Sequence, residues 1–269
     1  MNKKHLFKSL FIAAIALFSS CNSEFWFDFL LGPQPKFIEE VEFEPALNIL
    51  GVIRPDSANG IPMSFVLLNQ LMQAVTSEID TTSLKDADIE VSLMEDGQPI
   101  QSFTFAYDST QQFPTIYRPI DFSPQAGNTY SLRCYRDGFP ELTATTTVPQ
   151  VPVIEDDFIS VSGNALHFSI VADSTAALYD IYLFSGFMPV FTRTMKAQSG
   201  NTSITLKFNG NLSDDAVLAI YAYDSKLSAY VTSPNVFFKP NTYRPPFTNV
   251  DGGYGCFGSL NLLVRTITP

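Results

Sequence analysis

Hydrophobic and polar residues alternate along much of the chain, and this alternation predicts β-strands. In residues 89–93 (Ile-Glu-Val-Ser-Leu) every second side chain is apolar, as in a strand with one buried face. The same period gives Tyr130, Leu132 and Cys134 a common face. It returns in residues 165–171, where His167 lies on the face opposite the apolar residues. Short alternating segments of this kind predict an all-β fold.

Turn-forming sequences separate these segments. Glu95-Asp96-Gly97 and Asp137-Gly138 each follow a predicted strand, and Asn209-Gly210 is a further turn signal. Residues 63–79 are ambiguous, since they fit either a helix or a strand that runs into a loop. Repeated short strands with closely spaced turns are typical of immunoglobulin-like sandwiches.

Prolines and acidic residues interrupt the middle of the chain at 149–157 and predict a domain boundary there. We therefore expect two immunoglobulin-like β-sandwich domains. The first comprises residues 46–150. The second comprises residues 151–269 and ends with a glycine-rich C-terminal motif.

Residues 1–20 have a different pattern, which predicts a secretory signal peptide. A basic start is followed by an apolar run from Leu10 to Phe18 and then by small residues. The run is shorter than the ~20 residues that span a bilayer as a helix. Leu17-Phe18-Ser19-Ser20-Cys21 resembles a lipobox, so we expect cleavage before Cys21 and a lipid such as palmitate on that cysteine. An ordinary signal peptide with an incidental cysteine is the alternative.

A strongly aromatic segment follows the predicted anchor, within the N-terminal stretch 21–45. It includes Phe25, Trp26, Phe27, Phe29 and Leu30, and Trp26 is the only tryptophan of the chain. These side chains fit the lipid headgroup region, where tryptophan is favoured, or a protein partner. They also fit packing against the folded domain, as most apolar clusters do.

The charge of the chain limits the partners that it can have. The net charge is −11, and removal of residues 1–20 leaves 13 basic against 27 acidic side chains, a balance of −14. Such a surface repels phosphate backbones, which argues against nucleic acid. It also repels anionic membranes, so attachment to a membrane requires the lipid.

Residues suited to catalysis are scarce, and we predict neither a catalytic residue nor a metal site. His5 leaves with the signal peptide, which makes His167 the only histidine of the mature chain. Cys134 and Cys256 are expected to be two separately buried thiols, with a disulfide as the alternative. Carboxylates are abundant, so a hydrolase that uses two of them is a weaker alternative. No cofactor motif is present, and we expect a protein that is not an enzyme.

The segment Asp251-Gly252-Gly253-Tyr254-Gly255-Cys256-Phe257-Gly258 is the most distinctive local sequence. Glycines at this spacing cradle a phosphate only before a helix, whereas residues 259–264 look like a strand. We therefore expect tight turning of the backbone beside aromatic rings.

The order of several motifs resembles a known family. These motifs are the lipobox, the lead-in at 40–56, the hairpin at 127–138, the strand that ends at Val148-Pro149, the stretch 233–237 and the glycine-rich segment 252–258. Together they resemble the Bacteroidota lipoproteins of domain-of-unknown-function family 4249. The resemblance implies an outer-membrane lipoprotein of two β-sandwich-like domains that is associated with TonB-dependent receptors. It implies no catalytic residue.

Three functions fit these observations. The first is a non-catalytic accessory or interaction subunit of a TonB-dependent receptor or another outer-membrane assembly, lipid-anchored and facing the cell surface rather than the periplasm. The second is a cell-surface receptor that binds glycans or proteins. The third is the carboxylate-dependent hydrolase.

Overall fold

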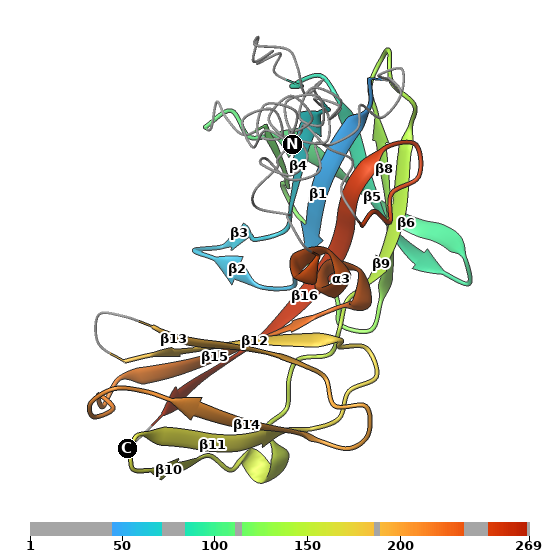
Figure 1. Cartoon of the computed structure of the whole chain (residues 1–269). Coiled ribbons are helices and arrows are strands. Elements are labelled where there is room, and N and C mark those ends of the chain that lie inside the picture. Colours follow the sequence, from blue (N-terminus) through green and yellow to red (C-terminus); the bar gives the residue numbers. More distant parts are fainter. Residues whose placement is uncertain (1–44, 72–83, 111–114, 186–188, 234–246, 268–269) are drawn as a thin grey trace, which may run out of the picture. The chain divides into compact units, whose positions relative to one another are not determined.

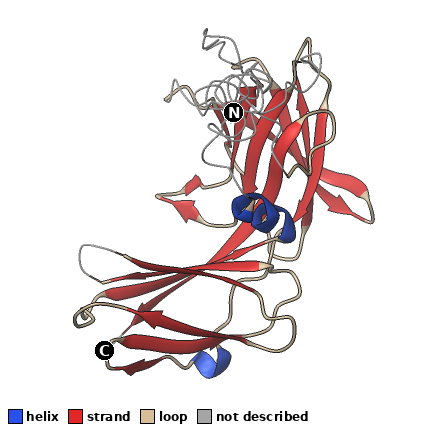
Figure 2. Cartoon of the chain, viewed as in Figure 1, coloured by secondary structure: helices blue, strands red, loops and turns tan. Residues whose placement is uncertain are grey.

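The computed structural model describes residues 45–71, 84–110, 115–185, 189–233 and 247–267. The fold is all-β, as the alternation predicts (Figures 1 and 2). The strands are β1 Leu47–Ile53, β2 Ser57–Ala58, β3 Ile61–Pro62, β4 Phe65–Gln70, β5 Asp88–Glu95, β6 Gln98–Tyr107, β7 Ile116–Pro119, β8 Thr129–Tyr135, β9 Leu142–Thr147, β10 Ser160–Ser162, β11 Ala165–Ile170, β12 Leu178–Phe184, β13 Val190–Met195, β14 Thr202–Lys207, β15 Ala216–Tyr223 and β16 Tyr254–Ile267. In the part of the chain that the structure describes, the helices are a short 3₁₀ turn, η1 Glu155–Asp157, and α3 Ser225–Thr232.

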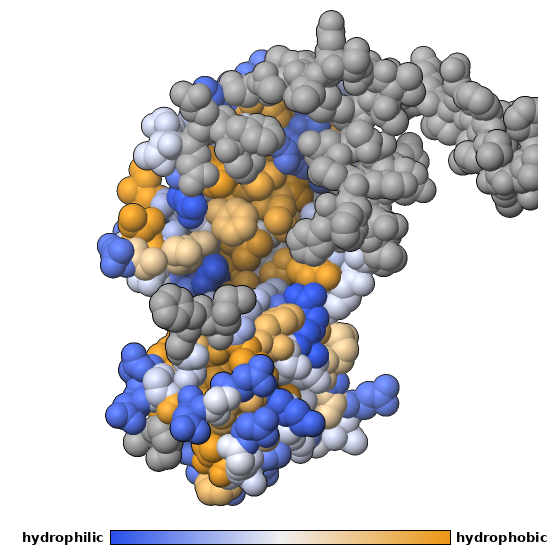
Figure 3. Space-filling view, turned by 60° about the vertical axis from the view of Figure 1, so that its left-hand side comes forward, coloured by the Kyte–Doolittle hydropathy of each residue, from blue (hydrophilic) through white to orange (hydrophobic). Residues whose placement is uncertain are grey.

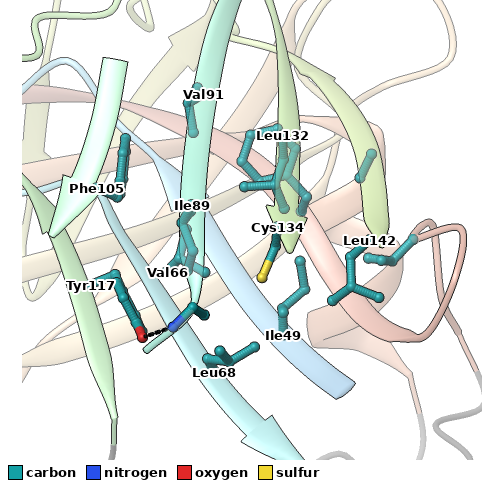
Figure 4. Close-up of a cluster of buried hydrophobic side chains, with 14 of the residues drawn as sticks. Ile49, Val66, Leu68, Ile89, Val91, Phe105, Tyr117, Leu132, Cys134 and Leu142 are labelled. Carbon is teal, nitrogen blue, oxygen red and sulfur yellow. Dashed lines mark hydrogen bonds between the residues drawn. The ribbon is translucent and has the colours of Figure 1, made fainter. Parts of the chain in front are cut away.

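The first sandwich, formed by β1, β4–β9 and the beginning of β16, encloses a core of aliphatic and aromatic side chains. Figure 4 shows part of this core, in which side chains of several strands converge, among them Ile49, Ile89 and Leu132. The Tyr117 hydroxyl lies in this core and forms two hydrogen bonds. It accepts one from the Ala87 amide at 3.1 Å and donates one to the Leu84 carbonyl oxygen. A buried hydroxyl without such partners would cost free energy.

The second sandwich packs the sheet β13–β12–β15–β16 against the three-stranded sheet β10–β11–β14. Leu166, Phe168 and Ile170 point into its core, whereas His167 is partly exposed. The predicted alternation in this strand is therefore confirmed.

The last strand takes part in the hydrogen bonding of both sandwiches. Residues 254–259 of β16 pair in parallel with β1, and residues 260–267 pair antiparallel with β15. One continuous ladder of eleven strands results, in the order β13-β12-β15-β16-β1-β4-β7-β6-β5-β8-β9. The described residues between 45 and 267 belong to one compact unit. The division at residue 150 stays a prediction.

The glycine-rich segment lies where β16 meets β1, and it is a packing element. At Gly255, φ is +112°, and a Cβ atom there would lie 1.9 Å from the carbonyl oxygen of Ile49. At Gly258, a Cβ atom would lie 2.7 Å from the Leu227 side chain of α3. Only glycine permits such close backbone approach. The expected tight turn is found at Gly252, where φ is +81°, whereas Gly255 and Gly258 lie within strand β16. The ring of Phe257 fills the space beside Gly51 of β1.

Two other local features were predicted or left open. The turn at Glu95-Asp96-Gly97 is confirmed, with left-handed φ values of 49° at Asp96 and 77° at Gly97. The ambiguous stretch 63–79 forms strand β4 over residues 65–70, and residues 72–83 lie outside the described ranges. No described helix combines the length and the hydropathy that crossing a membrane requires.

Candidate functional site

The outer face of the sheet β13–β12–β15–β16 carries exposed aromatic and aliphatic side chains. On β12, Tyr182 and Phe184 point away from the core that Ile181 and Leu183 enter. The register places Phe191 beside Tyr182 on the neighbouring strand. We call this surface the aromatic face and define it by Tyr182, Phe184, Phe191, Tyr221 and Val264.

Tyr182 is the centre of the aromatic face. Its ring centroid lies 4.8 Å from that of Phe191 in a tilted arrangement, and 6.0 Å from that of Phe184 in a stacked one. The Tyr221 ring meets it edge-on at 5.8 Å. Phe184 and Phe191 nevertheless remain 44% and 47% exposed, and Val264 is 56% exposed. Large apolar side chains that gather on one surface are typical of interaction sites. Figure 3 shows hydrophobic residues reaching the surface in both halves of the view.

A buried ion pair fixes one border of the aromatic face. Asp180 is 1% exposed, and Arg193 donates to its carboxylate from Nε at 2.6 Å and from Nη2 at 2.7 Å. These hydrogen bonds raise the pKa of Arg193 further above its ordinary value. The same guanidinium lies 5.9 Å from the Phe191 ring centroid. The two-pronged contact holds the arginine in one geometry, so the neighbouring aromatic ring is also held.

A second arginine borders the aromatic face at the end of β1. The Arg54 guanidinium lies 5.9 Å from the Tyr221 ring centroid and pairs with Asp56. The main chain at Arg54 is held by Ser64, whose hydroxyl accepts from the amide at 3.0 Å and donates to the carbonyl at 3.1 Å. Cations over aromatic rings stabilise such arrangements modestly. The aromatic face is therefore bordered on two sides by an arginine that is paired with an aspartate.

A buried polar network lies where β9, β16 and the start of α3 meet. Asp224 caps α3 by accepting from the Leu227 amide at 2.7 Å, and its second oxygen accepts from Thr146 Oγ1 at 2.7 Å. The Ser259 hydroxyl lies 2.9 Å from Thr146 Oγ1 and donates to the Thr147 carbonyl at 2.8 Å. Burial raises the pKa of Asp224, against the opposing effect of its hydrogen bonds. The network links strands from both sandwiches. Its buried hydroxyls already have hydrogen-bond partners within the protein. We therefore assign it a structural role.

The thiols predicted to be buried are found buried and unpaired. Cys134 and Cys256 are both free. Burial raises the pKa of Cys134 to about 12 and also raises that of Cys256. A thiol with a raised pKa is a poor nucleophile, because the thiolate is the reactive form. Within the described residues, no group of three or more His, Cys, Asp or Glu side chains is placed to hold a metal ion.

The lipidation site and the aromatic segment predicted from the sequence lie outside the described residues. This applies to Cys21 and to Phe25, Trp26, Phe27, Phe29 and Leu30. Sequence reasoning missed the aromatic face. Its one signal was that residues 181–184 (Ile-Tyr-Leu-Phe) are apolar at successive positions, as expected of a strand with apolar side chains on both faces.

The fold and these surfaces define an all-β protein of the sandwich class, with exposed aromatic residues on one sheet. No family model matches the sequence, and no curated protein matches it.

Several solved structures match at low similarity. Domains FN1-FN3 of chicken CNTN1 share 15% identity with this chain, with a TM-score of 0.22 over 84% of it and 67% of theirs. The chicken interferon gamma receptor alpha chain shares 8% identity, with a TM-score of 0.21 over 66% of this chain and 87% of its own. Type I pullulanase from Bacillus subtilis, solved with maltose, shares 10% identity, with a TM-score of 0.20 over 68% of this chain. The matched region spans 24% of the pullulanase chain.

Proposed function

We propose that this chain is a lipid-anchored interaction subunit at the outer membrane, which holds a protein partner through its aromatic face and catalyses no reaction. The proposed partner is a TonB-dependent receptor or another outer-membrane assembly. That choice of partner rests on the motif order that resembles family 4249. The observation that carries the proposal is the exposed, ordered set of aromatic side chains around Tyr182.

The proposed anchor provides the attachment that charge cannot. A mature chain with a balance of −14 is repelled by anionic headgroups. A lipid on Cys21 would overcome this repulsion and keep the protein beside membrane proteins.

The aromatic face has the properties of a binding surface for a protein. Aromatic residues and arginine are enriched where proteins bind. Aromatic side chains bury much area with few rotatable bonds. Contacts among the rings, and the ion pair of Asp180 with Arg193, restrict these side chains before binding. Less conformational entropy is then lost when the partner arrives.

The chemistry of the described residues supports a binding role over a hydrolytic one. The two thiols have pKa values raised by burial, and His167 makes its described side-chain hydrogen bond to a threonine hydroxyl. The buried Asp224 is engaged as a helix cap, and Asp180 is engaged by an arginine. Neither carboxylate is free to transfer a proton to a substrate.

Photo-crosslinking in intact cells tests the proposal. The photoreactive residue p-benzoylphenylalanine replaces Phe191 in one variant and Phe158 in a control, since Phe158 is 65% exposed on the other side of the second sandwich. We expect an adduct with one outer-membrane protein at 191, none with that protein at 158, and loss of the adduct when unlabelled wild-type chain is in excess. Equal adducts at both positions, or no adduct at 191, would contradict the proposal.

A further inference from the structure

A groove of about 550 Å³ lies on the outer face of the sheet β10–β11–β14. This volume falls within the range of roughly 300–1,000 Å³ that small-molecule sites occupy. The groove lies on the sheet opposite the one that bears the aromatic face. Its lining includes six residues that are suited to contact a ligand: Glu155, Asp156, Phe158, His167, Ser169 and Thr205.

Two rows of polar side chains form the floor of the groove. Strand pairing aligns His167 with Thr205, and His167 Nδ1 lies 3.1 Å from Thr205 Oγ1. Ser169 and Ser203 form the next row, with their hydroxyl oxygens 3.4 Å apart. Hydroxyls donate and accept. The second imidazole nitrogen of His167, Nε2, has no hydrogen-bond partner among the described residues. It can therefore form a hydrogen bond with a ligand.

Phe158 forms an apolar wall at the edge of this polar floor. Its side chain is 65% exposed, the largest exposure of any described phenylalanine. The turn η1 sets its position through two residues in the left-handed region, Asp156 at φ 53° and Asp157 at φ 52°. Aspartate is one of the residues that adopt this conformation in turns. The Asp157 carboxylate is also paired with Arg265 at 3.1 Å.

The charges around the groove select the kind of ligand. Glu155 and Asp156 line it, and no lysine or arginine does. An anionic ligand is therefore disfavoured, whereas carboxylates are strong acceptors for hydroxyl groups. A neutral sugar presents hydroxyls at its edge and C–H groups on its ring face, and these C–H groups suit stacking on an aromatic ring.

We propose that this groove binds a neutral saccharide. One sugar ring stacks on Phe158, and its hydroxyls bond to Glu155, Asp156 and His167. A second groove of about 400 Å³, on the face of β5, β8 and β9, has similar hydroxyl and carboxylate groups. It has no aromatic side chain in its lining and includes Arg133, so it lacks the stacking surface. Saccharide binding in the first groove does not require the protein partner proposed above.

Affinity electrophoresis of the full chain in detergent tests this site. Native gels contain starch, xyloglucan, galactomannan or laminarin as neutral polysaccharides, and polygalacturonate as an anionic one. We expect at least one neutral polysaccharide to slow the protein and polygalacturonate to leave it unaffected. Migration unchanged by every neutral polysaccharide, or slowed by polygalacturonate alone, would overturn the proposal.

Two substitutions locate the binding, and a third is the matched control. Phe158→Ala should weaken binding about tenfold or more, and His167→Ala about threefold. Phe191→Ala also removes an exposed phenylalanine, but from the aromatic face, and should bind as the wild type does. Wild-type affinity in Phe158→Ala, or an equal loss in Phe191→Ala, would refute the assignment to this groove. Circular dichroism confirms that each variant is folded.

Discussion

Replacing Asp224 with alanine tests the buried network that links the two sandwiches. In the wild type this carboxylate accepts from the Leu227 amide and from Thr146 Oγ1, both at 2.7 Å. Alanine leaves the amide of Leu227 buried without a partner, which costs roughly 1–3 kcal/mol. The lost bond from Thr146 costs about 1.5 kcal/mol or more, because its acceptor is charged. Relief of the carboxylate's desolvation opposes these losses. We expect the free energy of unfolding to fall by about 2–4 kcal/mol.

Asp224→Asn is the matched control. Asparagine caps helices as well as aspartate does, and its amide can donate to Thr146 Oγ1, which can turn its own hydrogen to Ser259. The free energy of unfolding should fall by less than about 1 kcal/mol. Urea denaturation followed by far-ultraviolet circular dichroism measures both variants. The structural role of Asp224 is refuted if the alanine variant is within about 0.5 kcal/mol of wild type, the range of ordinary surface substitutions.

The pH dependence of this difference is a second readout. Burial raises the pKa of Asp224 above 3.8 in the folded state, so the folded protein binds its proton more tightly than the unfolded chain does. Stability contributed by this group therefore falls as pH rises from 3.8 towards the raised pKa. Asparagine does not titrate. The stability of wild type relative to Asp224→Asn should therefore be greater at pH 4 than at pH 7, and the reverse order would contradict the assignment.

Two further predictions concern the strand junction and the cysteines. Gly255→Ala should lower the free energy of unfolding by at least about 3 kcal/mol, because the added Cβ would overlap a carbonyl oxygen of β1. In the control Gly210→Ala, φ is +81° but no atom lies within 4 Å of the added Cβ, so the loss should be only about 1–2 kcal/mol. Urea denaturation compares the two variants. Titration with Ellman's reagent should find no reactive thiol in the native protein and two, Cys134 and Cys256, in the denatured one. A third thiol would mean that Cys21 is unmodified.

Much of the fold could be predicted because it follows from local periodicity. Alternation identified the inward face of β11, and the Asp96-Gly97 turn marked a hairpin. The parallel pairing of β16 with β1 could not be predicted, since it joins residues some two hundred positions apart. Helix α3 was also missed. Its eight residues are too few for a periodic signal, and its stability depends on the cap at Asp224 and on packing against Gly258.

The candidate surfaces depend even more on tertiary structure. Phe158 and His167 are nine positions apart and come together only because the η1 turn folds beside β11. Tyr182 and Tyr221 meet because β12 and β15 are neighbours in the sheet. In the sequence, His167, Tyr182 and Tyr221 look like ordinary strand residues, and Phe158 only follows the predicted boundary at 149–157. By contrast, the leader and Cys21 form a contiguous motif, which is why a sequence alone can predict the anchor.

Recovery of the membrane partner from cells that express Phe191→Asp tests the central claim most directly. A charge on the aromatic face, beside Tyr182, should reduce the amount of partner that co-purifies at least tenfold. Phe158→Asp, which places the same charge on the opposite side of the second sandwich, should leave it unchanged. Both variants should retain the circular dichroism spectrum of the wild type, since both side chains are exposed. Undiminished recovery with Phe191→Asp, or equal losses in the two variants, would contradict the proposal that this face holds the partner.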